Sequence, residues 1–401
     1  MMATCEKVHG DFWRIRMALA VLVVLDVTLM RSMTAVKADS LCSGVIFGLG
    51  YACNEYTVQT SDGFLLGMYN IPYGVAGPSS AYRIPVLLMH GFQAGGDNWL
   101  LNSPQESLGT ILADQGYDVW IGNNRDVQWS NGHVIYGYND SGYWDWTWDE
   151  LAAYDLVALI NFVYTQRGNT PVSYVCHSQG CMTFFACLTG TPYATQVASQ
   201  LRLAVLLAPF THTGHITAPM QNLILSSYSD TILPFLGIGP VNAKALVDGI
   251  CNQGRQSCDN LISGLTGPSS FLNDSRTPYY LNFFPQVTSS KNYNHYGQAK
   301  RSDLFQKYDK GPINNLLSYG QLEPPLYDLS TFPTSFPVQI FTGGIDGLAD
   351  PVDTQWTLSN LPSGLNKEVL NFPNYGHLDF MIGYNAYVDI YPSVLSFLSS
   401  Q

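Results

Sequence analysis

Three residues of this 401-residue sequence, Ser178, Asp346 and His377, are of the types that together activate a hydroxyl group. A serine hydroxyl is a weak nucleophile, so it needs an imidazole to take its proton and a carboxylate to hold that imidazole in the right tautomer. The three residues follow one another along the chain in the order serine, acid, histidine, which is the order expected when the serine lies on a strand-to-helix turn. The residue types and their order predict cleavage of an acyl bond by a serine nucleophile.

Ser178 lies in the stretch T-P-V-S-Y-V-C-H-S-Q-G-C-M-T-F-F, residues 170–185. A β-rich run enters a tight turn at residues 177–180, and a helix-compatible run follows. This layout is that of a nucleophile elbow, which lifts a serine hydroxyl above the edge of a sheet. The usual pattern is G-x-S-x-G, but Cys176 stands in place of the first glycine, so a small polar turn before a helix is the alternative interpretation.

The acid and the base each have competitors. Asp346 is the first acid after an apolar strand-like run and is favoured; Asp350 and Asp353 follow closely, and either could instead cap the next helix. His177 is beside Ser178, but adjacent residues on a sharp turn point in different directions, so we expect packing or a local hydrogen bond. His90 is expected to shape its loop. The remaining candidates carry no spacing argument and are interpreted as ordinary polar residues: His133, His212, His215 and His295.

Attack on an ester places negative charge on the carbonyl oxygen, which two backbone N–H groups should stabilise. One donor is expected from Gln179, the residue after the nucleophile. The other is expected from Phe92, because residues 90–92 (H-G-F) follow a continuous apolar strand. A plain strand-ending turn is the alternative interpretation of H-G-F. We therefore predict an oxyanion hole made of Phe92 and Gln179.

The elements that would position these residues are short apolar runs alternating with helix-like segments. A hairpin is predicted around residues 61–63, and strands are predicted at 86–89, 117–121, 172–175, 203–207, 337–341 and 367–372. Helical periodicity is seen at 105–115, 148–164 and 384–398. This alternation predicts a mostly parallel sheet with helices on both faces. In such sheets reactive groups lie at the carboxyl ends of strands, which is where Ser178, Asp346 and residues 90–92 occur.

The chain divides into four segments. Residues 1–38 are interpreted as a secretory signal peptide, with an uncleaved signal anchor as the alternative. Residues 39–209 and 327–401 are predicted to form the two parts of the core. Between them, residues 210–326 contain prolines, short apolar segments and polar loops, and are predicted to form a helical cap or lid. No other run is apolar enough over about 20 residues to span a membrane.

The charge and the cysteines limit the possible functions. A net charge of −12 argues against nucleic acid as a partner, because nucleic-acid binding requires a basic face. Disulfides are predicted for Cys42–Cys53 and Cys251–Cys258, as expected in an oxidising compartment. The three cysteines around the elbow are interpreted as buried packing residues: Cys176, Cys181 and Cys187. No spacing resembles a zinc site. Sequons at Asn139 and Asn273 indicate N-glycosylation.

These motifs together give the chain a resemblance to the acid lipase family, which includes gastric and lysosomal acid lipases and plant relatives. The resemblance is carried by C-N-E-Y-T-V-Q-T-S-D-G (53–63), H-G-F with D-N-W-L-L-N-S-P (97–104), L-A-D-Q-G-Y-D-V-W (112–120), Y-W-D-W-T-W-D-E-L (143–151), H-S-Q-G, G-G-x-D-x-L-A-D-P (343–351) and Y-G-H-L-D-F (375–380). It implies an α/β-hydrolase fold with a helical lid, Ser178, Asp346 and His377 as the catalytic residues, and no cofactor or metal. The chain departs from the pattern of this family in two places, at Cys176 and in the altered stretch 124–130.

Three functions compete at this point. The first is a secreted or vacuolar (lysosomal) lipase that cleaves triacylglycerols or other acylglycerols at a lipid–water interface. The second keeps the mechanism and changes the substrate to steryl esters, phospholipids or soluble carboxylic esters. The third, motivated by Cys176, is a catalytically weak lipid-binding protein that retains the fold.

Overall fold

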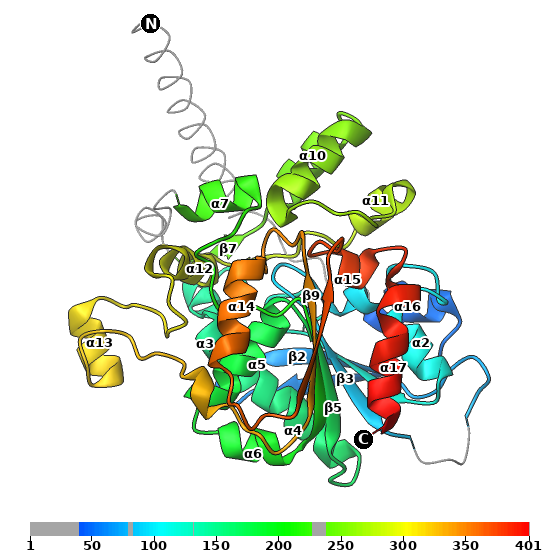
Figure 1. The fold of residues 1–401 in the computed structure, drawn as a ribbon, viewed down its shortest axis with the longest axis horizontal. Coiled ribbons are helices and arrows are strands. Elements are labelled where there is room, and N and C mark those ends of the chain that lie inside the picture. Colours follow the sequence, from blue (N-terminus) through cyan, green and yellow to red (C-terminus); the bar gives the residue numbers. More distant parts are fainter. Residues whose placement is uncertain (1–39, 79–82, 131, 227–237, 401) are drawn as a thin grey trace, which may run out of the picture.

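The protein is described by a computed structural model that covers residues 40–78, 83–130, 132–226 and 238–400 (Figure 1). The signal peptide predicted for residues 1–38 lies outside the described residues. Within them, no helix is both long and apolar enough to cross a membrane.

The core is one eight-stranded sheet with the strand order β1-β2-β4-β3-β5-β6-β9-β10. Strands β1 and β2 form the predicted antiparallel hairpin, β2 is also antiparallel to β4, and every other neighbouring pair is parallel. The mostly parallel sheet predicted from the sequence is therefore confirmed. The bounds are β1 Asn54–Gln59, β2 Leu65–Ile71, β3 Pro85–Met89, β4 Asp118–Gly122, β5 Val172–His177, β6 Leu201–Leu207, β9 Val338–Gly343 and β10 Lys367–Phe372.

Helices cover both faces of this sheet, which explains why its central strands are buried along their whole length. Every residue of β3, β4 and β5 is buried. Figure 1 shows α2 and α17 on one side and α4, α5 and α14 on the other. The core helices are α2 Leu108–Asp114, α3 Trp148–Glu150, α4 Leu156–Gln166, α5 Gln179–Gly190, α6 Ala194–Ser199, α14 Pro351–Asn360, α15 Asp379–Ile382, α16 Ala386–Asp389 and α17 Tyr391–Ser400.

The helix predicted for residues 148–164 is formed by α3 and α4, joined through a π-helical turn at Leu151–Asp155. Thr147 and Glu150 begin it with a capping box, in which each side chain bonds the backbone of the other. The single helix predicted for 384–398 is wrong. That stretch forms α16 and α17, which meet at Ile390; Pro392, at the start of α17, cannot continue a helix from the preceding turn because it has no N–H group and its ring crowds that turn.

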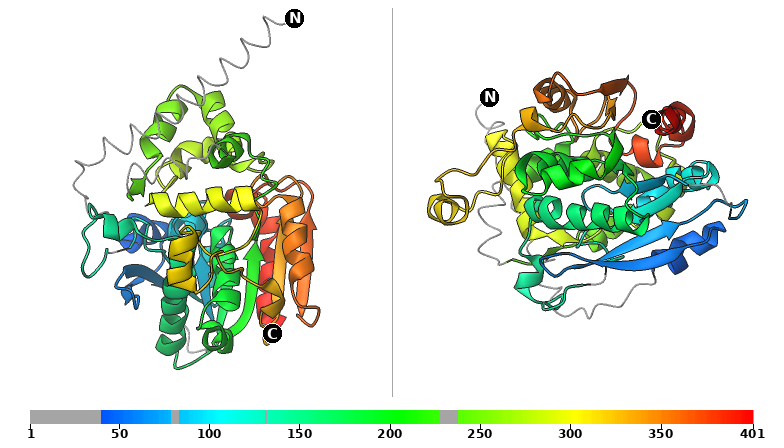
Figure 2. Two further views of the ribbon diagram at one scale, coloured as in Figure 1. Left: turned by 90° about the vertical axis from the view of Figure 1, so that its left-hand side faces the viewer. Right: turned by 90° about the horizontal axis from the view of Figure 1, so that it is seen from below.

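The segment between β6 and β9 contributes no strand to the large sheet within its described residues. It contains a two-stranded pair, β7 Pro240–Val241 with β8 Thr288–Ser289, and a series of helices. Figures 1 and 2 show α7, α10 and α11 beyond one end of the sheet, and α13 standing away from the rest. That residues 210–326 form a distinct cap stays a prediction. The helices are α7 Pro219–Ser226, α9 Lys244–Cys251, α10 Arg255–Thr266, α11 Thr277–Tyr280, α12 Ser290–Ser302 and α13 Pro312–Tyr319.

Two cross-links predicted from the sequence are confirmed. Cys42–Cys53 ties the first turn of the described chain to the start of β1, and Cys251–Cys258 joins α9 to α10. Both close short loops, as is usual in chains that fold in an oxidising compartment.

A buried ion network surrounds Arg125, in the loop after β4. Its guanidinium is 1% exposed, lies 2.6 Å from a carboxylate oxygen of Asp155 and 2.8 Å from one of Asp62, and stacks over the ring of Phe64 at 3.9 Å. Asp155 is fully buried, and burial raises its pKa to about 6 despite the neighbouring arginine. Arg125 therefore compensates charge in the core while joining the β1–β2 turn, the loop after β4 and the helix at 151–155.

We predict that Arg125→Met destabilises the fold by about 3–5 kcal/mol, because it leaves buried Asp155 without its cation. Chemical denaturation would measure the loss. Arg255→Met is the matched control, since Arg255 is 66% exposed and its ion pairs with Asp259 and Asp274 lie at the surface. That control should cost less than about 1 kcal/mol. An equal small effect of both substitutions would contradict the role given to Arg125.

Candidate active site

Ser178 lies on the turn between β5 and α5 with φ 56° and ψ −122°, a backbone conformation that side-chain-bearing residues rarely adopt. Its N–H donates to the carbonyl of Leu207 at the end of β6, 3.1 Å away. Its own carbonyl accepts from the N–H groups of Cys181 and Met182 in the first turn of α5. The turn is thus fixed on both sides by backbone hydrogen bonds, and strain of this kind persists only where the surroundings over-determine the conformation.

Two glycines allow this turn to approach the end of β3. A Cβ atom on Gly180 would lie 2.6 Å from the carbonyl oxygen of His90, and one on Gly91 would lie 2.9 Å from the Cβ of Ser178. Real Cβ atoms do not come so close to other heavy atoms. The glycines of H-S-Q-G and H-G-F are therefore required because two loops of the sheet edge are in direct contact.

The structure brings Ser178, His377 and Asp346 together. His377 Nε2 is 2.8 Å from Ser178 Oγ, and His377 Nδ1 is 2.9 Å from Asp346 Oδ2 and 3.0 Å from Oδ1. All three side chains are buried. Since a carboxylate can only accept, Nδ1 carries the hydrogen and Nε2 is free to accept from the serine hydroxyl. The arrangement can move a proton off Ser178 onto the imidazole.

Asp346, after β9, is held by the chain that follows it. Its Oδ1 atom accepts from the backbone N–H groups of Leu348 at 2.9 Å and Ala349 at 2.8 Å. The two competing acids are used elsewhere. Asp350 caps α14 by accepting from the N–H of Val352, and Asp353 bonds both the backbone and the ring of His215. Only Asp346 of the three contacts His377 in the described structure.

The loop that carries His377 is fixed by two residues whose part in the site the sequence did not reveal. His177 Nε2 donates to the carbonyl of His377 at 3.0 Å, and burial together with the neighbouring imidazole holds the pKa of His177 well below its usual value. Asp379 accepts from the N–H of Gly376 at 2.8 Å and from the hydroxyl of Ser269. Both hold the backbone around His377 without contacting its Nε2 atom.

Phe92 and Gln179 lie on the two loops that meet at Ser178. Gln179 begins α5, where a backbone N–H has no acceptor within the helix, and the dipole of the helix favours negative charge. Phe92 packs its ring against Tyr293 and Tyr296 of α12, with centroids 5.4 and 4.8 Å apart. The next residue, Gln93, accepts from the N–H of Gln286 at 2.8 Å. The segment between β6 and β9 therefore contacts the loop of Phe92 directly.

His90 shapes the end of β3, as the sequence predicted. Its Nε2 accepts from the N–H of Asn124 at 3.1 Å, so Nδ1 carries the hydrogen and donates to the carbonyl of Gly91. Complete burial lowers the pKa of His90 to about 4. The ring is neutral and holds together the loops after β3 and β4.

The interpretation of Cys176 and Cys181 as separate packing residues is wrong, because the two form a disulfide. The sharp turn at Ser178 brings their Cα atoms to 5.2 Å, within the range that a disulfide spans. Cys176 near the end of β5 and Cys181 in the first turn of α5 become neighbours only once the elbow has formed. Cys187 is a free, buried thiol, as expected. A sequence spacing of five residues gave no sign of the bond.

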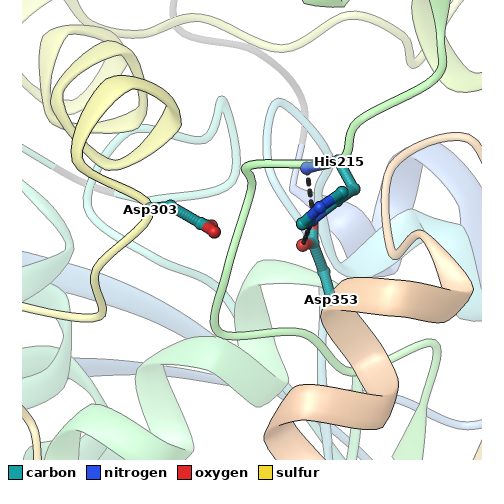
Figure 3. A group of neighbouring side chains, drawn as sticks. All are labelled: His215, Asp303 and Asp353. Atoms are coloured by element: carbon teal, nitrogen blue, oxygen red, sulfur yellow. Dashed lines mark hydrogen bonds and ion pairs between the residues drawn. The ribbon is translucent and has the colours of Figure 1, made fainter.

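One further cluster has the residue types of a metal site. His215, Asp303 and Asp353 offer ligand atoms within 4.8 Å of one another (Figure 3). His215 Nδ1 is 2.7 Å from Asp353, while Asp303 accepts from the N–H of Gly214. Nearby, Lys300 donates to the carbonyl of Gly214 and already supplies positive charge. We interpret this cluster as an ion pair between the loop after β6 and α14.

The chain is similar in sequence and in fold to known proteins. A model described as "alpha/beta hydrolase fold" matches residues 84–384, and one described as "Partial alpha/beta-hydrolase lipase region" matches residues 42–103. Triacylglycerol lipase 1 of Arabidopsis thaliana is 39% identical, over 90% of this chain and 91% of its own. Human gastric triacylglycerol lipase is 34% identical, over 87% and 88%. A solved putative lipase from Sulfolobus solfataricus has a TM-score of 0.51 at 15% identity, over 87% and 94%, which is a likeness of fold alone.

The loop after Phe92 also contains a buried acid whose ionisation can be tested. Asp97 is fully buried and accepts from the indole N–H of Trp129 at 2.5 Å; burial raises its pKa to about 7. Because the pKa of Asp97 is higher in the folded than in the unfolded protein, the folded state holds the proton more tightly. The stability that this contributes is complete below the unfolded pKa of 3.8 and is lost as the pH rises through about 7.

We therefore expect Asp97→Asn to be about 1–4 kcal/mol more stable relative to wild type at pH 8 than at pH 4. Denaturant titrations of both proteins at several pH values would measure this difference. Titrations of the other groups cancel in the comparison. A difference in stability that does not change with pH would mean that Asp97 is ionised throughout.

Proposed function

Because this chain belongs to the α/β-hydrolase fold family and to the lipases within it, we propose that it hydrolyses triacylglycerols by way of Ser178. The observation that carries the proposal is the hydrogen-bonded relay from Ser178 Oγ through His377 to Asp346, with distances of 2.8 and 2.9 Å. As a member of this family the chain is a carboxylic ester hydrolase.

In the first step His377 Nε2 takes the hydroxyl proton as Ser178 Oγ attacks the ester carbonyl. Asp346 keeps the hydrogen on Nδ1 and stabilises the imidazolium that forms. His377 then gives its proton to the departing alcohol, which leaves the acyl group on Ser178. Water, deprotonated by the same nitrogen, then attacks the acyl carbonyl. The bond to Ser178 Oγ breaks, Oγ takes the proton back from Nε2, and the fatty acid is released. Every proton transfer uses Nε2, so no cofactor or metal is needed.

The negative charge of the tetrahedral intermediate falls on the carbonyl oxygen. We assign its stabilisation to the backbone N–H groups of Phe92 and Gln179. The position of Gln179 at the start of α5 supports this, because the free N–H and the helix dipole both favour an anion there. Every substitution other than proline keeps the backbone N–H, so the geometry of the two loops controls how well the negative charge is stabilised.

We favour a lipid over a soluble ester as substrate because apolar side chains are exposed on the protein surface. Two large apolar side chains of α13 are largely exposed, Ile313 at 76% and Leu317 at 79%, on a helix that stands away from the sheet. An exposed apolar group of this kind suits a lipid–water interface. The alternative with the same mechanism, a steryl-ester or soluble carboxylesterase, keeps every site residue. The weak lipid-binding alternative requires that the hydrogen-bonded residues Ser178, His377 and Asp346 take no part in catalysis.

The disulfides of the described chain support maturation in the secretory pathway. Asn139 of the first sequon is exposed, as an N-glycosylated residue must be. We propose an extracellular or vacuolar (lysosomal) location.

The first test concerns the nucleophile. Ser178→Ala should lower kcat on emulsified triacylglycerol by at least about 10⁴-fold, because the attacking atom is removed. A fluorophosphonate probe should label the wild type at Ser178 and leave the variant unlabelled. Retained hydrolysis in the variant, or labelling elsewhere in the wild type, would overturn the proposal.

The second test concerns the substrate. Ile313→Ser with Leu317→Ser should lower the rate on emulsified long-chain triacylglycerol about tenfold and leave the rate on a soluble short-chain ester unchanged, since the relay is untouched. Val75→Ser, in the exposed loop after β2, is a matched apolar-to-polar control. A profile over acyl-chain length and pH in wild type completes the test. An absolute preference for soluble acetyl esters would favour the second function.

A further inference from the structure

We propose that the Cys176–Cys181 disulfide positions the nucleophile, by fastening the strand before Ser178 to the helix after it. The inference rests on the proposed function of Ser178. It assigns a catalytic consequence to two residues that do not touch the substrate, and it makes them positioning residues.

The disulfide spans the turn that it would control. Cys176 is held in the centre of the sheet, where β5 pairs with β3 at Met89 and with β6 at Leu206. Cys181 is in the first turn of α5, and its N–H donates to the carbonyl of Ser178 at 2.9 Å. The four residues between them, 177–180, are the turn itself. A covalent bond therefore joins the rigid strand to the rigid helix across the reactive residue.

The turn needs such a constraint because its backbone is strained. Ser178 has φ 56°, and a residue with a side chain leaves this region unless its neighbours prevent it. Three backbone hydrogen bonds already oppose relaxation, one to Leu207 before the helix and two from Cys181 and Met182 within it. They weaken if α5 shifts along or away from β5. The disulfide limits that shift to the small range that its fixed bond length allows.

Global stability is a weaker explanation for the bond. The chain-entropy contribution of a disulfide grows with the length of the loop it closes, and this one closes the shortest loop of the three, with a separation of 5 residues against 7 and 11. Both of its cysteines are also fully buried, in a central strand and in the first turn of a helix that follows that strand. What the bond adds is local geometry at Ser178.

The consequence for catalysis follows from the short distances of the relay. Ser178 Oγ must stay 2.8 Å from His377 Nε2 while the N–H of Gln179, the next residue, faces the developing charge. A shift of α5 relative to β5 moves both groups at once. A misplacement of about 1 Å can cost on the order of 10²-fold in rate.

The test uses Cys176→Ala, Cys181→Ala and the double variant, with Cys187→Ala as control, since Cys187 is a free buried thiol on the same helix. Fluorophosphonate titration gives the concentration of competent sites, and kcat is expressed per titrated site. We expect kcat to fall about 10- to 100-fold in all three variants, with KM on a soluble ester within twofold of wild type and Cys187→Ala unchanged. Either single substitution breaks the same bond, so the effects should not add.

A purely structural role gives a different result. Fewer sites would titrate, but each would turn over at the wild-type rate. That result, or mass mapping that finds both thiols free in the native wild type, overturns the inference. Wild type that is not labelled at Ser178 overturns the proposed function instead, so the two failures are distinguishable.

Should the variants not fold, the wild type itself supplies the measurement. In dithiothreitol the partly exposed disulfides at Cys42–Cys53 and Cys251–Cys258 should open first, without loss of rate. The Cys176–Cys181 bond, whose sulfur-bearing residues are fully buried, should open later. Loss of kcat should follow the appearance of thiols at 176 and 181 in mass mapping. An unchanged rate after this disulfide is reduced contradicts the inference.

Discussion

The site depends on the backbone of one residue, Ser178, which is held at φ 56° between a strand and a helix. An ordinary extended or helical backbone at this position would turn the hydroxyl away from the edge of the sheet. The neighbouring glycines, Gly91 and Gly180, are consequences of this requirement, because the loops that surround the turn leave no room for a Cβ atom. The disulfide across the turn is a third device that serves the same conformation.

The parallel sheet explains how residues far apart in the sequence meet at this point. Strands β3, β5, β9 and β10 all end at the same edge, and the loops after them bring His90, Ser178, Asp346 and His377 there. Ser178 and His377 are 199 residues apart and are joined at 2.8 Å. A sheet of this kind supplies position, while the loops supply chemistry. The order serine, acid, histidine along the chain reflects the order in which the strands are visited.

Much of this could be predicted from the sequence, because the predictive patterns are local. Apolar runs reveal buried strands, and a G-G-x-D turn after such a run distinguishes Asp346 from Asp350 and Asp353. What could not be predicted depends on tertiary contact. Asp379 bonds Ser269 and the turn at Gly376, and Arg125 bonds Asp62 and Asp155. These contacts join segments that are far apart in the sequence, and no local pattern in one segment indicates its partner in the other. Nothing in the sequence marks Cys181 as the partner of Cys176, because the two become neighbours only through the turn.

The insertion between β6 and β9, which adds no strand to the large sheet within its described residues, is bound to the loops of Phe92 and His377. Gln286 bonds the backbone of Gln93, next to Phe92, and Ser269 bonds Asp379, two residues after His377. The loop expected to supply an oxyanion donor and the loop that supplies the imidazole are thus each anchored to a different part of the same insertion. A change in the position of the insertion must strain these contacts or move the loops with it. Residues of the insertion are therefore coupled mechanically to the loops of Phe92 and His377, and we expect substitutions there to alter kcat as well as KM.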